Sequence, residues 1–579
     1  MSEPAPSLLP PEAAGLPVWR VLDTRFHAAR LFALWQAWRE RAQRPRLLHV
    51  VAFTPSVPPA SALLAAASPA QQELAAELAT QWLGLLPGFH RLGLAQGQLQ
   101  LTLCVGELQP LLREQQFEAD AVFLDSACPW DRWSVKALAR CARRGTILAA
   151  GTLTPEVRKL LPESGFELQG DRGCYDPHWE IKTSREPLRT QAAPRGHCAV
   201  IGAGLAGASV AAALARRGWQ VQVLDAAPQA AAGASGLPAG LLVPHVSVDD
   251  SPRSRLSRAG LRLMRQEAQR LLHAGEDWAP SGVLERRLDD SPGLPAHWPA
   301  ADHDLTRLAA KLAAQAWHAD ARTVPELWHP QAAWIKPARL VQAWLAQPGV
   351  QFRGEARVHA LRRSGRQWAL LDRDGALLAS ASHVVLANAG DAPRLLAALG
   401  FSAGLPAMHE MRGVLSSGLH QAGEEAALPP FPVNGSGSLI PAVPTADGLA
   451  WYAGATYEVA DHAPAPASEH HRSNLDKLRT LLPAVAQLLA PSFEPGAARG
   501  WGGTRCVSAD RLPLVGPLEE GGQPTLWISA AMGSRGLSFA MLCAELLASR
   551  LGAEPWPLEA SLARFLHARR KPVAHDEEF

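Results

Sequence analysis

A G-x-G-x-x-G motif in the middle of the chain has the residue types and spacing of a phosphate-binding turn. Its glycines, Gly202, Gly204 and Gly207, follow a short apolar run and open an alanine-rich helical pattern that includes Leu205 and Ala206. The first glycine permits a tight turn, the second lets a pyrophosphate approach the backbone, and the third lets the helix pack against the strand. The N-terminus of the helix presents free N–H groups and a partial positive charge. The motif therefore predicts a dinucleotide-binding turn.

An acidic residue follows this motif at the distance that a dinucleotide-binding βαβ unit requires. A second apolar run, 220–224, ends at Asp225, which lies 18 residues after Gly207. A carboxylate at the end of the second strand accepts hydrogen bonds from ribose hydroxyls, and it is expected about 20 residues after the glycines. We therefore predict a Rossmann-type unit with Asp225 on the ribose.

Later segments favour FAD over NAD. A loop of small residues contains Ser235 and Gly236, and the run 383–388 reads as a strand that returns to the cofactor. Near the C-terminus a second glycine-containing segment precedes a helix whose N-terminus would stabilise negative charge on a reduced flavin. Its candidate cofactor residues are Gly533, Ser534, Gly536 and Leu537.

The order and spacing of these segments over 197–570 resemble the D-amino-acid-oxidase superfamily, which includes glycine and sarcosine oxidases. This resemblance implies an FAD-binding Rossmann-type domain with an antiparallel-sheet substrate subdomain. It also implies that Arg505 and Arg535 hold a substrate carboxylate, because a planar guanidinium binds a carboxylate through two parallel hydrogen bonds. The alternative for each arginine is a surface or structural ion pair.

Histidines offer further acid–base candidates. His245 and His409 lie in segments of the same domain, but for each we favour a packing or hydrogen-bonding role, and the sequence does not decide whether either takes part in chemistry. Oxidation of an amine by hydride transfer needs no protein nucleophile, since the cofactor carries the reaction. We expect the pair His470 and His471 to mark an exposed helix start.

The first 180 residues alternate short apolar runs with helical patterns, which predicts a parallel sheet covered by helices. Periodicity stops at a polar, proline-containing stretch near residues 183–196. We therefore expect an α/β protein with domains 1–185 and 197–579, joined by a linker at 186–196. The strands expected in the first domain are 18–22, 47–53, 99–105, 121–124 and 146–150.

Taken together, the two halves resemble the MnmC family of bifunctional tRNA-modifying enzymes. The stretches that carry this resemblance are 21–24, 35–39, 44–52, 119–125, 157–160, 204–208, 216–219, 234–236 and 533–537. The family implies an N-terminal methyltransferase domain that uses S-adenosylmethionine, and a flavin domain that converts the carboxymethylaminomethyl group of the wobble uridine in tRNA to an aminomethyl group. That substituent is an N-substituted glycine, which suits a glycine-oxidase-like site.

The methyltransferase half departs from the family pattern where S-adenosylmethionine should bind. The segment Arg25–Arg30 contains no glycine, so its side chains would crowd a ligand that needs close backbone approach. The second strand is followed by Thr54 and Pro55 instead of an acid, and the loop 126–131 lacks the expected asparagine-proline pair. We predict a degenerate methyltransferase that serves as a scaffold or as a tRNA-docking surface.

Composition adds limits to these hypotheses. The net charge of +2 alone does not indicate a polyanion partner, but arginines cluster in a way that suits phosphate contacts, with solvated helix ends as the alternative. The clusters are Arg39, Arg41, Arg44 and Arg46; Arg140, Arg143 and Arg144; and Arg569, Arg570 and Lys571. The seven scattered cysteines predict neither a metal site nor a disulfide framework. We expect a cytoplasmic monomer without a membrane span.

Three functions remain open at this point. The first is an FAD-dependent tRNA-modifying oxidoreductase. The second is an oxidase or dehydrogenase of a small amino acid such as glycine or sarcosine. The third is an RNA-binding scaffold with a structural flavin. The basic clusters and the N-terminal domain favour the first, because a free amino acid needs neither.

Overall fold

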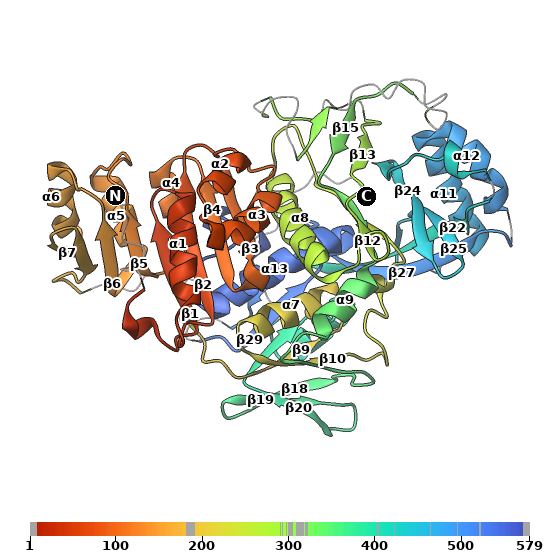
Figure 1. Ribbon diagram of the computed structural model, residues 1–579. Coiled ribbons are helices and arrows are strands. Elements are labelled where there is room, and N and C mark those ends of the chain that lie inside the picture. The colour runs from red at the N-terminus through yellow and green to blue at the C-terminus, as the bar shows by residue number, and fades with distance from the viewer. Residues whose placement is uncertain are drawn as a thin grey trace.

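Figure 1 shows an N-terminal α/β unit at one end of the molecule, a central sheet with its helices, and a third group of strands and helices at the other end. The computed structural model describes residues 9–570 except 181–191, 290, 292, 297, 299–304, 309–317, 319–321, 402–403, 422, 462, 464, 495 and 520–522. Lys571 and residues 186–191 of the expected linker therefore lie outside the described residues.

The N-terminal unit is built on one eight-stranded sheet with the order β3-β4-β2-β1-β5-β6-β8-β7. Its five central strands are parallel, and apart from the exposed first half of β6 they are almost wholly buried, which is why their sequences read as continuous apolar runs. They confirm the five strands expected from the sequence, and they are β1 (Val18–Asp23), β2 (Leu47–Thr54), β4 (Leu99–Val105), β5 (Ala119–Leu124) and β6 (Ala142–Ala150). The antiparallel outer strands, which the sequence did not reveal, are β3 (Gly88–Leu94), β7 (Phe166–Gln169) and β8 (Arg172–Tyr175).

Helices cover both faces of this sheet, as a parallel sheet requires. One face packs against α1 (Ala28–Arg39), α2 (Ala60–Ala65) and α3 (Gln72–Gln81). The other packs against α4 (Leu108–Arg113), α5 (Arg132–Ala139) and α6 (Pro155–Glu163). The strand order reverses between β1 and β5, so the carboxyl ends of these two strands form the place where such a fold binds ligands.

The central sheet joins segments that are far apart in the chain, in the order β17-β10-β9-β21-β29-β28. All neighbours are parallel except β28. The strands are β9 (His197–Ile201), β10 (Gln220–Leu224), β17 (Val350–Arg353), β21 (His383–Leu386), β28 (Leu514–Pro517) and β29 (Leu526–Ala530). On one face lie α7 (Leu205–Arg216), α9 (Pro337–Leu345) and α13 (Gly536–Leu551); on the other lies a small antiparallel sheet of β18 (Ala360–Ser364), β19 (Gln367–Leu371) and β20 (Leu377–Ala381) (Figure 1).

The third sheet forms the expected substrate subdomain, and its strands are interleaved in sequence with those of the central sheet. Its order is β14-β15-β13-β23-β24-β25-β22-β26, with β27 paired to β22. All its pairings are antiparallel except that of β13 with β23. The strands are β13 (Val283–Arg286), β14 (Arg307–Leu308), β15 (Glu326–His329), β22 (Met408–Leu419), β23 (Val433–Gly435), β24 (Gly437–Thr445), β25 (Gly448–Gly454), β26 (Glu458–Val459) and β27 (Arg499–Ser508), and the covering helices are α11 (Ala467–Leu481) and α12 (Pro483–Leu489).

A buried charge network joins the N-terminal unit to the central one. Glu545 of α13 accepts hydrogen bonds from Arg216 at 3.1 Å and Arg217 at 2.9 Å, and its Oε2 lies 3.5 Å from Nη1 of Arg91 in β3. Arg91 also donates to the carbonyl oxygen of Pro555 at 2.6 Å. The helix α8 (Pro252–Leu271) packs against both β3 and α13. The two units therefore share a buried polar interface.

Candidate active site

The glycine-rich turn after β9 has the close contacts that its sequence predicts. A Cβ at Gly202, whose φ is +107°, would lie 2.5 Å from the carbonyl oxygen of Ala387. A Cβ at Gly207 would lie 1.8 Å from the carbonyl oxygen of Gly202. Gly204 is the N-cap of α7, and it has no side chain to cover the first turn. Only glycine fits at 202 and 207, and no side chain at 204 covers the N-terminus of α7.

Two further segments meet at the start of α7. Ser235 Oγ accepts a hydrogen bond from the N–H of Leu205 at 2.9 Å, so its short 3-10 turn, η5 (Ala234–Gly236), lies against the glycine-rich turn. A Cβ at Gly536 would lie 3.3 Å from Cδ1 of Leu205, which places the N-terminus of α13 beside the same helix end. Leu537 in turn contacts Gly240, with its Cδ1 3.0 Å from where a Cβ would stand. The structure thus brings the three predicted cofactor segments together.

Asp225 binds the backbone of the turn. Its Oδ2 accepts a hydrogen bond from the N–H of Ala203 at 2.7 Å, and its Oδ1 accepts one from Ala227 at 2.8 Å. A carboxylate has about four acceptor positions, so the remaining lone pairs are open to a ribose hydroxyl. The carboxylate therefore stabilises the turn itself, and its predicted contact with a ribose stays a prediction.

The strand β21 returns to this turn as expected and adds a polar group. A Cβ at Gly202 would lie 3.0 Å from Cα of Asn388, directly after β21. Among the described residues, Oδ1 of Asn388 is buried with no hydrogen-bond partner. A buried acceptor without a partner costs free energy unless a ligand or water satisfies it. The residues present thus fit a dinucleotide: a glycine-rich turn, a helix N-terminus that no side chain at Gly204 covers, and a buried acceptor without a donor.

Arg505 extends from β27 towards the C-terminal cofactor segment. Its Nη1 donates to Ser534 Oγ at 2.8 Å, and its guanidinium lies 5.5 Å from the ring centre of Tyr457. Across the strand pair, Gly413 makes room for it, because a Cβ there would stand 1.9 Å from Nη2. Burial lowers the pKa of Arg505 below its ordinary value, although the group stays charged at neutral pH. It therefore presents a half-buried, charged fork next to the predicted flavin segment.

Arg535 follows Ser534 directly and lies in a cluster of charges. Burial lowers its pKa, as do the charges of Arg253 and Arg287, whereas the charge of Glu285 opposes this shift. Burial raises the pKa of Glu285, but a hydrogen bond from His329 at 2.9 Å and the nearby arginines hold it below its ordinary value. No sequence motif marks the charged residues around Arg535. Only the fold shows that Arg253 on α8, Glu285 on β13 and Arg287 directly after β13 act on it.

Of the four histidines, His470 and His471 differ from their expected surroundings. His245 is half-buried, and its Nδ1 lies 2.9 Å from Ser254 Oγ. Burial, together with the charges of Arg535 and Arg253, lowers its pKa to about 4, so it is neutral at pH 7. His409 is exposed on β22. The expectation of exposure for His470 and His471 is wrong: both are buried within α11, and Nδ1 of His471 lies 2.7 Å from Ser416 Oγ, because the first turn of that helix packs on β22.

The N-terminal unit holds an internal ion pair where its fold would bind a ligand. Asp23 ends β1, and it accepts a hydrogen bond from Arg30 Nη1 at 2.9 Å; Arg30 Nη2 lies 3.7 Å from Asp125, just after β5. The Arg30 guanidinium also lies 3.6 Å from the ring centre of Phe123. Burial raises the pKa of Asp23 to about 7, although the charge of Arg30 opposes this. The Arg30 side chain therefore lies between the carboxyl ends of β1 and β5.

Several arginines of the predicted phosphate-binding clusters instead form contacts within the protein. Arg570 forms a buried ion pair with Asp510, at 2.6 Å, and Arg569 donates to the carbonyl oxygen of Leu518. Arg46 donates to the carbonyl oxygen of Arg216 in the other unit at 2.8 Å. The prediction of a free basic cluster at the C-terminus is therefore wrong for Arg570, because its charge is neutralised inside the fold.

The part of the chain that the structure describes contains no group of three or more histidine, cysteine or acidic side chains able to hold a metal ion. Within that same part, no helix is both long enough and apolar enough to cross a membrane.

The comparisons with known proteins match both halves. The family model for FAD dependent oxidoreductases matches residues 197–550. The model for S-adenosyl-L-methionine-dependent methyltransferases matches residues 69–176, and so begins after β1, β2 and the Arg25–Arg30 segment. Glycine oxidase from Geobacillus kaustophilus shares the fold of the second half, with 20% identity, a TM-score of 0.51, and coverage of 66% of this chain and 99% of that one. Fold and site together define an FAD-dependent oxidoreductase that carries a methyltransferase-like domain.

Two relatives match almost the whole chain. The tRNA 5-methylaminomethyl-2-thiouridine biosynthesis bifunctional protein MnmC of Albidiferax ferrireducens is 48% identical over 96% of this chain and 93% of its own length. The protein of the same name from Polaromonas naphthalenivorans is also 48% identical, over 95% of this chain and 90% of its own length. The chain belongs to the MnmC family.

Proposed function

We propose that this protein removes the carboxymethyl group from 5-carboxymethylaminomethyl-2-thiouridine at the wobble position of tRNA, leaving 5-aminomethyl-2-thiouridine. The observation that carries the proposal is the near end-to-end similarity to relatives named for this tRNA modification. The anticodon loop suits such a reaction, because its bases are accessible without opening a duplex.

The substrate's side chain is an N-substituted glycine, and the residues of the site suit its chemistry. Bound FAD would accept the hydride, which carries two electrons, from the carbon next to the carboxylate. Arg505 and Arg535 would hold that carboxylate and so direct the neighbouring C–H bond. Loss of the hydride and of the amine proton forms a C=N bond, which water cleaves to the aminomethyl product and glyoxylate.

We also propose that the N-terminal domain, residues 1–185, is a degenerate methyltransferase that does not bind S-adenosylmethionine. The Arg30 side chain lies between Asp23 and Asp125 at the strand ends where a ligand would enter. The domain then serves as a scaffold or docking surface for tRNA, and the protein works as a monomer in the cytoplasm. Titration calorimetry with S-adenosylmethionine tests the first point: micromolar affinity would overturn it.

The main test uses tRNA that carries the carboxymethylaminomethyl group. Incubation with the purified flavoprotein, followed by digestion and nucleoside analysis, should show conversion to the aminomethyl nucleoside. Turnover of free glycine or sarcosine with unchanged tRNA would instead establish an amino-acid oxidase. No turnover of either, with tightly bound tRNA, would establish a scaffold with a structural flavin.

A further inference from the structure

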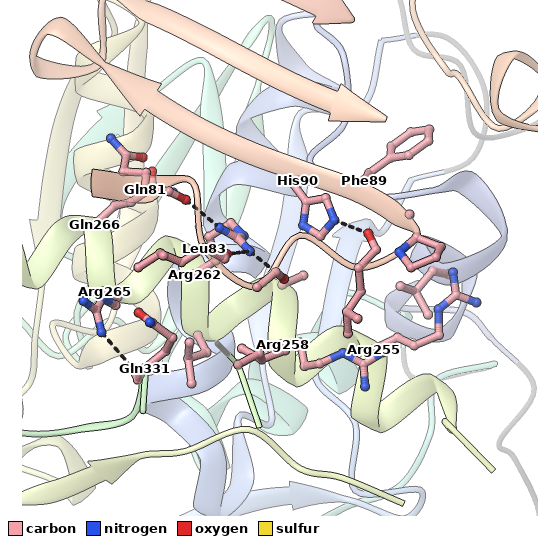
Figure 2. Close-up of a pocket in the computed structure, with 18 of the residues that line it drawn as sticks. Gln81, Leu83, Phe89, His90, Arg255, Arg258, Arg262, Arg265, Gln266 and Gln331 are labelled. Atoms are coloured by element: carbon pink, nitrogen blue, oxygen red, sulfur yellow. Dashed lines mark hydrogen bonds between the residues drawn. The ribbon is translucent and has the colours of Figure 1, made fainter. Parts of the chain in front are cut away.

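The contact between residues 80–90 and α8 is closed by its own polar groups (Figure 2). Arg262 donates hydrogen bonds to the carbonyl oxygens of Gln81 at 3.1 Å and Leu83 at 2.8 Å. The cavity beside them is about 70 Å³, far below the roughly 300–1,000 Å³ of a site for a small organic ligand. This contact therefore joins the two units. An open surface lies instead in the third sheet, beside Arg505.

Tyr457 is an exposed aromatic residue next to a candidate substrate-binding residue. It is 47% exposed, and its ring centre lies 5.5 Å from the guanidinium of Arg505. The other exposed aromatic residues in the part of the chain that the structure describes are Trp133 and Trp179 in the N-terminal unit and Phe352 on β17. Tyr457 thus combines an accessible ring with a place beside the predicted carboxylate-binding fork.

Backbone contacts on both sides hold Tyr457 in this place. Thr456, directly before it, donates its N–H to the carbonyl oxygen of Val414 at 3.1 Å, and its Oγ1 accepts a hydrogen bond from the N–H of Val414 at 3.0 Å. Directly after it, β26 pairs with β22. The exposed ring is therefore carried by an anchored stretch of backbone, so little backbone entropy would be lost when a ligand contacts it.

A glycine allows Arg505 to reach this ring. Arg505 comes from β27 on one side of β22, and the segment that carries Tyr457 lies on the other side. A Cβ at Gly413 of β22 would stand 1.9 Å from Nη2 of Arg505 and 2.6 Å from the carbonyl oxygen of Thr456. The guanidinium therefore lies over Gly413 and beside Tyr457, while its Nη1 donates to Ser534 Oγ. Fork and ring lie side by side, next to the predicted flavin segment.

The side chain of the proposed substrate places its two recognisable groups at a matching separation. A methylene, the amine and a second methylene separate the carboxylate from the uracil ring, so four bonds of about 1.5 Å bring the ring within roughly 5 Å of the carboxylate carbon. A residue that contacts the ring while an arginine holds the carboxylate must therefore lie next to that arginine. Aromatic side chains stack on nucleic-acid bases, because every base has a π-face.

We propose that Tyr457 stacks on the uracil ring of the substrate while Arg505 holds its carboxylate, so that the site prefers the modified nucleoside to free glycine or sarcosine. This inference rests on the proposed function. Sarcosine has the carboxylate and the amine but no ring, so it gains nothing from Tyr457. Stacking of a base on an aromatic side chain strengthens binding by about tenfold or more.

Titration calorimetry of the full-length flavoprotein, with its flavin reduced, tests this proposal. The probes are the nucleoside 5-carboxymethylaminomethyl-2-thiouridine and sarcosine. Because a reduced flavin accepts no hydride, affinity is measured apart from turnover, and the result holds whether or not the protein modifies tRNA. The nucleoside should bind about tenfold more tightly than sarcosine. Equal affinities, or no binding of the nucleoside at millimolar concentration, would overturn the proposal.

Variants assign the preference to the ring. Tyr457→Phe keeps the ring and should keep the preference of the parent. Tyr457→Ala should bind the nucleoside about tenfold more weakly, with unchanged affinity for sarcosine and unchanged flavin content. The matched control is Trp133→Ala, at a residue of α5 that is 55% exposed and lies outside the site, and it should bind both probes as the parent does.

Three results with these variants would contradict stacking. An equal loss of affinity for both probes in Tyr457→Ala would mean that the ring only holds Arg505 in place. A parent-like preference in Tyr457→Ala would mean that the ring does not contact the base. Loss of the preference in Tyr457→Phe would assign it to the hydroxyl group instead of the ring.

Discussion

Arg505 donates a hydrogen bond to Ser534 Oγ at 2.8 Å, which joins a strand of the substrate subdomain to the turn that precedes α13. The contact places the predicted carboxylate-binding arginine beside the predicted flavin segment, although 29 residues separate the two along the chain. The geometry of this pair underlies the first prediction.

Replacing Arg505 with lysine keeps the charge but removes the planar fork. We expect kcat/KM for modified tRNA to fall roughly 10- to 100-fold, in line with the loss of a charge-assisted hydrogen bond. Steady-state kinetics on the tRNA substrate measures this. Arg499→Lys on the same strand, an exposed residue paired with Asp447, is the control and should retain parent kinetics. An unchanged kcat/KM in Arg505→Lys would exclude the fork from substrate binding.

Gly207→Ala should release the flavin. The added Cβ would meet the carbonyl oxygen of Gly202 at 1.8 Å, so α7 must move away from β9 and its N-terminus from the pyrophosphate. The ratio of flavin to protein absorbance after purification should drop several-fold. Gly151→Ala, in the N-terminal unit, serves as the control, because nothing lies within 4 Å of its added Cβ and its φ lies outside the left-handed region. Full flavin loading of Gly207→Ala would refute the close-packing argument.

Asp23 should make the stability of the protein depend on pH. Because burial raises its pKa from 3.8 to about 7, the folded state binds the proton more tightly than the unfolded state. The stability from this group is fully present below pH 4 and is lost as the pH rises through 7. Asp23→Asn should therefore show a smaller fall in thermal midpoint between pH 5 and pH 8 than the parent.

Asp171→Asn, at an exposed ion pair with Arg158, controls for a general loss of surface charge and should keep the parent's pH dependence. If Asp23→Asn shows the same fall in thermal midpoint as the parent, Asp23 does not titrate in this range.

Glu545→Gln should weaken the contact between the two α/β units. The carboxylate faces Arg91, Arg216 and Arg217, and its loss leaves buried positive charge, which costs about 3–5 kcal/mol. Burial raises the pKa of Glu545, but the arginines hold it well below its usual range, so its contribution is present at neutral pH and is lost only in strong acid. Calorimetry should show the same lowering of the thermal midpoint at pH 6 and pH 8.

The control is Glu425→Gln, at an exposed residue, and this variant should have the thermal midpoint of the parent. Equal midpoints for Glu545→Gln and the parent would mean that the network does not stabilise the protein.

Local patterns along the chain predicted the elements well. The strands expected at 220–224 and 99–105 have the same bounds in the structure, as β10 and β4. The antiparallel strand β3 was missed, since its alternation is irregular and two glycines interrupt it. The surroundings of side chains were harder to predict from the sequence. His470 was expected to be exposed, but the packing of α11 on the sheet buries it.

The sequence by itself determined the nucleotide-binding turn, because Gly207 and Asp225 contact the backbone of the turn itself, at Gly202 and Ala203. The sequence also shows that the segment Arg25–Arg30 contains no glycine. Only the tertiary structure decided what the charges do. Arg30 lies between the ends of β1 and β5, and Arg570 forms an ion pair with Asp510. Glu545 lies within ion-pair distance of arginines from both domains. Ion pairs depend on distance in space, and folding brings together charges as far apart in the chain as Arg217 and Glu545, which 328 residues separate.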